Sequence, residues 1–158
     1  MTETVIENSL DKPRLGWREW AALPELNISE IKAKIDTGAR SSALHAFAIE
    51  PYRKGHQHWL MFAIHPVQKD SSVVLECHAP IKDRRMVSDS GGHKQRRYVI
   101  ETPLVLGHSM IMAEMTLTNR DSMLFRMLIG RTAMNNRFII EPSASFLLGK
   151  PCFDADKN

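Results

Sequence analysis

Alternating apolar and polar residues dominate the middle of this chain, a spacing typical of half-buried β-strands. Residues 31–35 read Ile-Lys-Ala-Lys-Ile, and Leu75 and Cys77 alternate with polar neighbours. Residues 59–64 form an apolar run that is too short for a helix. This run and the alternating segment after it are expected to pair as a β-hairpin.

Gly91 and Gly92 lie between two further strand-like segments, residues 86–88 and 98–100. Adjacent glycines adopt the positive φ angles of a tight hairpin tip without steric cost. The sequence therefore predicts a second hairpin, with its tip at residues 90–93.

A third hairpin is predicted where residues 104–106 and the alternating stretch 111–117 flank a turn at Gly107. Residues 14–30 are expected to form a strand and a proline-containing turn that lead into residues 31–35. Together these patterns indicate a mostly β chain.

Residues 36–39, Asp-Thr-Gly-Ala, directly follow the strand predicted at 31–35. Much later, the apolar run 127–129 is closed by Gly130, and a short helix with Thr132 as its cap is predicted over 132–136. Alone, Asp-Thr-Gly is more often an ordinary strand-ending turn. In combination, the two elements resemble one retropepsin subunit.

The motif suits hydrolysis by two carboxylates that share one proton and hold a water between them. The chain has one such motif, so the pair requires two chains about a two-fold axis, each contributing Asp36. Gly38 lets the backbones approach closely, and the hydroxyl of Thr37 can brace the loop across the dimer. A catalytically silent dimeric scaffold is the competing interpretation, against which the intact motif argues.

Four strings of residues resemble the bacterial RimB-type, retropepsin-like peptidases, a family also labelled "ATP-dependent zinc protease". They are residues 16–20 (GWREW), 31–46 (IKAKIDTGARSSALHA), 119–121 (NRD) and 128–131 (LIGR). The resemblance covers about residues 14–150. It implies an all-β closed barrel of six strands with one short helix, working as a homodimer, and strand rather than helix at 41–49. Arg126 stands where the family usually has proline.

The resemblance also implies an aspartic endopeptidase with Asp36, Thr37 and Gly38 as its catalytic motif. It further implies a functional link to an ATP-grasp glutamate ligase, with an acidic or glutamate-tailed peptide as substrate. The candidate substrate-binding residues are Lys34, Ala39, Arg40, Arg84, Arg85, Ser88, Gly91, Gly92, Arg96, Arg97, Asn119, Arg120 and Asp121.

Composition fits one globular domain, with 158 residues, 43% hydrophobic and 25% charged. We expect a flexible segment at 1–13, the peptidase domain at 14–150 and a flexible tail at 151–158. No secretory signal or membrane span is evident, which favours a cytoplasmic protein. The net charge of +3 permits an acidic partner without demanding nucleic acid.

Neither metal nor ATP has a clear binding motif. His56 and His58 lie two apart without an evident third ligand, and solvated loop histidines are the simpler interpretation. No glycine-rich phosphate loop is present, so any ATP dependence would belong to a partner enzyme. We therefore expect no cofactor and no catalytic metal.

The predicted flap is basic. Residues 82–97 contain six Lys or Arg against two Asp, a local charge of +4 (six minus two). A solvated hairpin edge explains this charge as well as substrate capture does, although guanidinium groups match the carboxylates of an acidic peptide. Nucleic-acid binding is the third alternative, but Tyr98 is the one aromatic residue nearby.

Lys34 lies two residues before Asp36, and residues two apart project to the same face of a strand. Its ammonium is expected either to lie beside the carboxylate pair and favour its ionised form, or to reach solvent or pair with Glu30 or Glu50.

Overall fold

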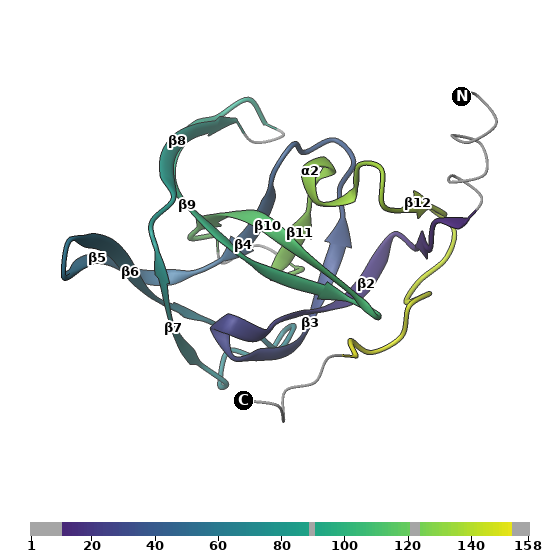
Figure 1. Cartoon of the computed structure of the whole chain (residues 1–158), viewed down its shortest axis with the longest axis horizontal. Helices are drawn as coiled ribbons and strands as arrows, with labels where there is room; N and C mark the ends of the chain where they lie inside the picture. The colour runs from purple at the N-terminus through teal and green to yellow at the C-terminus, as the bar shows by residue number, and fades with distance from the viewer. Residues whose placement is uncertain (1–10, 89–90, 121–123, 153–158) are drawn as a thin grey trace.

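A computed structural model describes residues 11–88, 91–120 and 124–152 of the chain (Figure 1). In chain order its elements are β1 (Arg14–Leu15), β2 (Arg18–Leu23), the 3-10 helix η1 (Pro24–Leu26), β3 (Ile28–Ile35), β4 (Ser42–His45), β5 (Phe47–Lys54), β6 (Gln57–Ile64), β7 (Leu75–Pro80), β8 (Asp83–Ser88), β9 (Lys94–Leu106), β10 (Ser109–Thr118), β11 (Met127–Ile129), α2 (Arg131–Met134) and β12 (Ile139–Ile140). The mostly β class with one short α-helix is confirmed. The outermost residues expected to be flexible, 1–10 and 153–158, lie outside the described chain.

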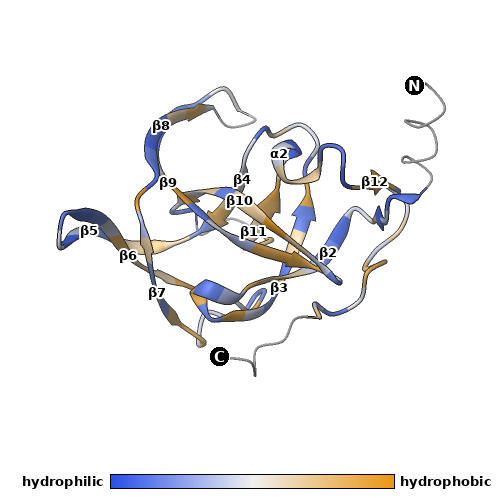
Figure 2. Ribbon diagram, in the orientation of Figure 1, coloured by the Kyte–Doolittle hydropathy of each residue, from blue (hydrophilic) through white to orange (hydrophobic). Residues whose placement is uncertain are grey.

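Seven strands form the main sheet in the order β10-β4-β11-β3-β2-β9-β8, and β10 also pairs with β9. The sheet curls around a core of aliphatic side chains, and Figure 2 shows the apolar residues concentrated in its central strands. A fully closed barrel is not shown, because β2 and β9 share a single registered pair, Ala22 with Val105. The expectation of closure was therefore too strong for this junction.

Strands β5, β6 and β7 form a second, antiparallel sheet beside the first. The predicted β6–β7 hairpin is confirmed, with Phe62 opposite Cys77. Leu60, Phe62 and Ile64 are almost completely buried, whereas the turn between β5 and β6 is polar and projects from the body (Figure 2). Alternate residues of β6 are buried although residues 59–64 are apolar throughout, whereas in β7 the alternate burial matches the alternation seen in the sequence.

Both glycine-containing hairpins are confirmed. Strand β8 pairs antiparallel with β9, and Gly92 near the tip has a φ of +82°. Strands β9 and β10 are joined at Gly107, which has a φ of +58°. The left-handed backbone at these turns suits glycine, which has no Cβ to clash.

Residues 42–45 and 47–49 form strands, as the resemblance implied and propensity did not. Strand β4 lies between β10 and β11, parallel to β10 with Met115 opposite Ser42. All four residues of β4 are buried. Pairing on both edges and burial on both faces therefore override the helical preference of this segment.

Helix α2 begins one residue earlier than predicted, and Thr132 is not its cap. The N-cap residue is Gly130, which makes no side-chain capping bond. The N–H groups of Arg131 and Thr132 donate instead to the carbonyl oxygens of Ala39 and Arg40, at 2.8 and 3.0 Å. The first turn of the helix is satisfied by a remote loop rather than by a hydroxyl.

Glu19, within the Gly-Trp-Arg-Glu-Trp string, is completely buried. Its carboxylate accepts hydrogen bonds from the N–H groups of Gly16, Leu147 and Leu148, at 2.7, 2.9 and 3.1 Å. A Cβ on Gly16 would lie 2.2 Å from the carbonyl oxygen of Ala144. The string thus binds the segment after β12 to the start of the domain, a role that sequence alone did not reveal.

Among the described residues, no helix is long and apolar enough to cross a membrane.

Candidate active site

Asp36 lies immediately after β3, at the point where β3 separates from the parallel strand β11. Its N–H donates to the carbonyl oxygen of Ile129 at 2.9 Å. The N–H of Gly38 donates to Oδ1 of Asp36 at 3.0 Å, and the N–H of Ala39 donates to the carbonyl oxygen of Asp36 at 3.3 Å. The turn therefore holds the aspartate side chain in a fixed orientation while leaving Oδ2 for other contacts.

The start of α2 holds the same loop from the other side. Besides the two backbone bonds of its first turn, Nη1 of Arg131 donates to the carbonyl oxygen of Thr37 at 3.1 Å. The N–H of Gly130 donates to Oγ of Ser42 at 3.1 Å. The two motifs predicted to act together, near residues 36–39 and 127–132, are thus in direct contact.

A pocket of about 500 Å³ opens beside Asp36, between its loop and the flap strand β8. Its lining consists of Asp36, Gly38, Ala39, Arg40, Ser41, Ala43, Arg85, Met86, Val87, Ser88, Arg97, Thr116, Arg120 and Leu128. Four of these are arginines, and Asp36 is the one carboxylate among them. The pocket therefore combines a fixed carboxylate with cationic walls.

The predicted site residues divide into two groups. Those that line the pocket are Asp36, Gly38, Ala39, Arg40, Arg85, Ser88, Arg97 and Arg120. Those outside its lining are Lys34, Thr37, Arg84, Gly91, Gly92, Arg96 and Asn119, while Asp121 lies outside the described residues. The roles of all of them stay predictions, because position alone does not assign one.

The sequence did not single out six lining residues as site residues: Ser41, Ala43, Met86, Val87, Thr116 and Leu128. Thr116 reaches the pocket because β10 runs parallel to β4, and its hydroxyl donates to the carbonyl oxygen of Ser42 at 3.2 Å. A parallel pairing between segments so far apart leaves no local signal in the sequence.

The flap arginines have different surroundings. Arg97 is buried, with 7% of its surface exposed, and its Nε donates to Oε1 of Gln95 at 3.2 Å. Arg84 stacks over Tyr98 at 4.9 Å from the ring centroid, and Arg96 is exposed. Arg85 contacts the carboxylates of Asp83 and Glu114. The six basic residues of this hairpin therefore do not act as one uniform patch.

Arg40 and Arg120 contribute to the pocket from loops on either side of β4 and β10. Arg40 is exposed and makes no ion pair among the described residues. The backbone N–H of Arg120 donates to Nδ1 of the buried His45 at 3.1 Å. The backbone N–H of His45 donates to the carbonyl oxygen of Arg126. This bond anchors the loop around Arg126, where the family usually has proline.

Lys34 is exposed on β3, where it lies opposite Arg18 of β2 and Leu128 of β11. Asp36 lies beyond the end of the strand, in the turn. The alternation of side chains along β3 therefore does not fix the direction of Asp36 relative to Lys34. The expected influence of Lys34 on Asp36 stays a prediction.

Within the described ranges, no group of three or more His, Cys, Asp or Glu side chains could hold a metal ion. His78 contacts the hydroxyl of Tyr52 and the carboxylate of Glu76, at 2.9 and 3.1 Å. His56 and His58 are exposed at the β5–β6 turn.

Comparison with known proteins places this arrangement in a family context. The family model described as "Retropepsin-like aspartic endopeptidase RimB" matches residues 14–151. Curated relatives include proteins named "Probable alpha-L-glutamate ligase" from Shewanella pealeana, 43% identical over 86% of this chain, and from Desulfotalea psychrophila, 40% identical over 92%. The chain spans 30% and 31% of the length of these two relatives.

A solved structure of similar fold comes from Legionella pneumophila and is described as a protein of unknown function. It is 26% identical, covers 86% of this chain and 98% of its own, and superposes with a TM-score of 0.71. The match extends over nearly the whole of that protein, so the two share one architecture.

Proposed function

Because this chain belongs to the RimB-like family of retropepsin-like aspartic endopeptidases, we propose that it supplies one half of a homodimeric peptidase site. The observation that carries the proposal is the fixed carboxylate of Asp36 at the wall of the 500 Å³ pocket. A second copy placed about a two-fold axis contributes the other Asp36.

In this site the two carboxylates share one proton, since two like charges in contact cannot both ionise cheaply. The ionised member takes a proton from a water held between them, and the protonated member donates to the carbonyl oxygen of the scissile peptide. The oxygen of the water forms the new bond to carbon while the π electron pair of the carbonyl moves to the carbonyl oxygen, which takes the donated proton. When this adduct collapses, the now ionised carboxylate takes the proton back, the carbon–nitrogen bond breaks, and the now protonated carboxyl donates its proton to the leaving nitrogen. In each subunit the N–H of Gly38 donates to Oδ1 of Asp36 and so holds the carboxylate in the orientation that the pair requires.

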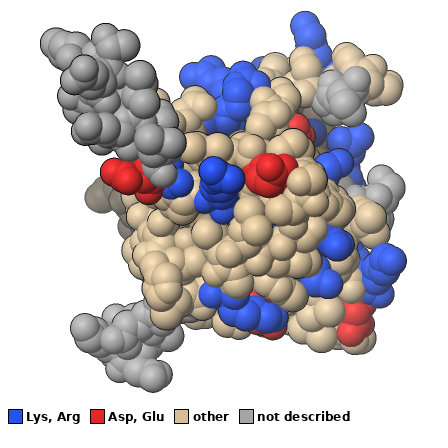
Figure 3. Space-filling view, turned by 90° about the vertical axis from the view of Figure 1, so that its right-hand side faces the viewer, with Lys and Arg blue, Asp and Glu red and all other residues tan. Residues whose placement is uncertain are grey.

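An acidic peptide suits the walls of this pocket. Arg40, Arg85, Arg97 and Arg120 line it, and guanidinium groups pair with carboxylates in a two-pronged geometry. The names of the curated relatives support a glutamate-rich substrate and a link to glutamate ligation. On the face seen in Figure 3, Lys and Arg appear as separate spots among uncharged residues, unlike the continuous stripe of a nucleic-acid binder.

Replacement of Asp36 by Asn tests the proposal, because the amide keeps the shape of the side chain but cannot act as the base. We expect hydrolysis of a glutamate-tailed peptide to be lost while sedimentation still reports a folded dimer. A chelator should leave the wild-type activity unchanged. Retained activity in Asp36→Asn together with inhibition by the chelator would favour a metal mechanism and reject the carboxylate pair.

A further inference from the structure

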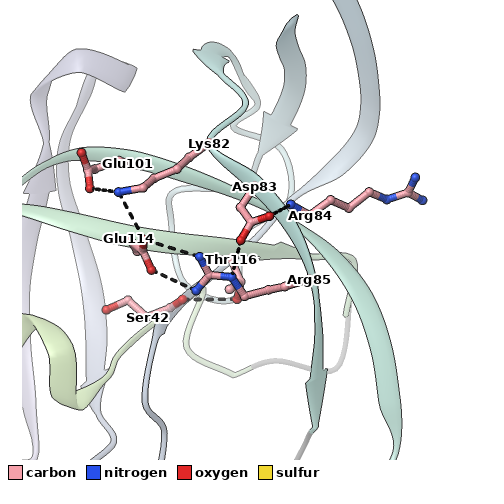
Figure 4. A network of polar contacts seen from close by, with 8 residues as sticks. All are labelled: Ser42, Lys82, Asp83, Arg84, Arg85, Glu101, Glu114 and Thr116. Atoms are coloured by element: carbon pink, nitrogen blue, oxygen red, sulfur yellow. Dashed lines mark hydrogen bonds and ion pairs between the residues drawn. The ribbon is translucent and has the colours of Figure 1, made fainter.

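A cluster of five charged side chains connects the base of the flap to the body of the domain (Figure 4). The flap fastener, as we call it, consists of Lys82, Asp83, Arg85, Glu101 and Glu114. It contains two cations and three carboxylates, so its net charge is −1. Its carboxylates therefore neutralise part of the positive charge of the flap.

Arg85 is the central member of the flap fastener. Its Nη1 and Nη2 lie 3.0 and 3.5 Å from the two carboxylate oxygens of Glu114, and its Nε lies 3.0 Å from Oδ2 of Asp83. These hydrogen bonds raise the pKa of Arg85, the bond with Glu114 contributing most, and they lower the pKa of Glu114. Arg85 thus lines the pocket with a guanidinium already matched to carboxylates.

The position of Glu114 makes this pair a link between strands. Strand β8 lies at the end of the main sheet and pairs with β9, which in turn pairs with β10. Arg85 reaches from β8 across to Glu114 on β10. Two residues further along β10, Thr116 lines the pocket and holds β4 through Ser42. The link therefore spans three strands and ends at the pocket wall.

Lys82 supports the same carboxylate. Its ammonium forms an ion pair with Glu101 and lies 3.3 Å from Oε2 of Glu114. Glu101 and Glu114 face each other on β9 and β10, where two like charges would repel without this cation. Lys82 thus offsets the repulsion between the two carboxylates and allows them to lie opposite each other in the sheet.

We propose that Glu114 is a positioning residue of the flap, which holds β8 over the pocket through Arg85 and withdraws Arg85 from the arginines that receive an anionic substrate. The second part of this proposal, the withdrawal of Arg85 from substrate binding, rests on the proposed function. Reception of the anion then falls chiefly to Arg40, which is exposed and carries no competing carboxylate among the described residues.

Amide hydrogen exchange of residues 86–88 tests the positioning directly and needs no activity. Loss of a two-pronged ion pair within a network predicts exchange about threefold to tenfold faster in Glu114→Gln. Arg85→Gln should give the same increase, and the double variant no more, because the two residues act as one unit. Arg84→Gln is the matched control, because it leaves the Arg85–Glu114 contact in place, and its exchange should stay at the wild-type rate.

Peptide binding tests the second part, using pentaglutamate and its neutral isostere pentaglutamine with protein carrying Asp36→Asn to prevent hydrolysis. The ratio of the two Kd values should be unchanged in Arg85→Gln/Glu114→Gln, a double change that leaves the net charge of the protein as it was. In Arg40→Gln the preference for pentaglutamate should fall about tenfold, as expected for a lost charge-assisted pair.

Unchanged flap exchange in Glu114→Gln would overturn the positioning role. A double variant that loses as much preference for pentaglutamate as Arg40→Gln would show that Arg85 is itself a substrate anchor. If the Asp36→Asn protein binds neither peptide, the acidic-substrate proposal fails, while the exchange rates still decide whether Glu114 holds the flap.

Discussion

Gly130 approaches Ser41 so closely that a Cβ on the glycine would lie 2.5 Å from the carbonyl oxygen of Ser41. The carbonyl oxygen of Arg40 would lie 2.9 Å from the same atom. Both neighbours are backbone and belong to the loop that follows Asp36, so neither can rotate away. The glycine is what allows the loop of Asp36 and the start of α2 to share hydrogen bonds.

Gly130→Ala should therefore destabilise the fold and disturb the site together. Forcing a methyl group against fixed backbone costs about 1–3 kcal/mol of unfolding free energy, measured by urea denaturation. Peptidase activity should fall further than the loss of folded protein explains, because the bonds from Arg131 and Thr132 would shift. Gly55→Ala is the control: its φ of +65° makes alanine strained there, but no atom lies within 4 Å of the added Cβ, so it should lower stability and leave the activity of the folded protein intact. Equal activity in both variants would contradict the shared-loop geometry.

Glu19→Gln tests the buried carboxylate that receives three backbone N–H groups. The amide keeps one oxygen acceptor but turns an NH₂ toward remaining donors, so we expect a loss of about 2–4 kcal/mol in unfolding free energy. Glu30→Gln, at an exposed pair with Lys150, is the matched control and should change stability by less than about 0.5 kcal/mol. A comparable loss in both variants would indicate a general charge effect.

The four flap arginines should separate into two pairs. Replacing Arg84, Arg85, Arg96 and Arg97 together by Gln is expected to raise KM for acidic peptides and flatten its salt dependence, with little effect on neutral peptides. Only Arg85 and Arg97 line the pocket. Replacing Arg85 and Arg97 alone should reproduce the effect, chiefly through Arg97. Replacing the outer pair, Arg84 and Arg96, should not. Loss of salt-sensitive RNA binding in the outer pair would instead support a nucleic-acid function.

Acidification should weaken the flap fastener through Glu114. Its hydrogen bond with Arg85 lowers the pKa of Glu114 below the ordinary 4.5, so its stabilising effect is complete above pH 4.5 and disappears as the pH falls through the lowered value. Wild-type protein should unfold at a higher urea concentration than Glu114→Gln near pH 6, and the two midpoints should converge as the pH falls below 4.5. A difference that persists unchanged at the lowest pH would exclude ionisation as the source.

The sequence was most informative where local pattern and local structure coincide. The short apolar run in β6, the alternation in β7 and the glycines at the hairpin turns correctly predicted those strands. Residues 36–39 and the start of α2 were considered together because both motifs resemble a retropepsin subunit, and the structure brings them into contact. Each of these features depends on near neighbours or on a recognisable string.

What local pattern could not supply was pairing between distant segments. Thr116 enters the pocket through the parallel pairing of β4 with β10, and Gly130 replaces Thr132 as the cap because a remote loop supplies the acceptors. The charge of the flap was also misleading, since Glu101 and Glu114, which neutralise part of it, belong to the body of β9 and to β10. Strand β3 ends at Ile35, so its alternation does not decide between the two alternatives for Lys34, whose influence on Asp36 stays a prediction.

The bond from Arg131 to the carbonyl oxygen of Thr37 joins residues 94 positions apart. During synthesis, Asp36 therefore leaves the ribosome long before the residues that orient it exist. Closing so long a loop carries an entropic cost that is recovered only when β11 pairs with β3, so we expect this contact to form late in folding. Until residue 131 has been synthesised, the chain therefore carries Asp36 without the residues that orient it.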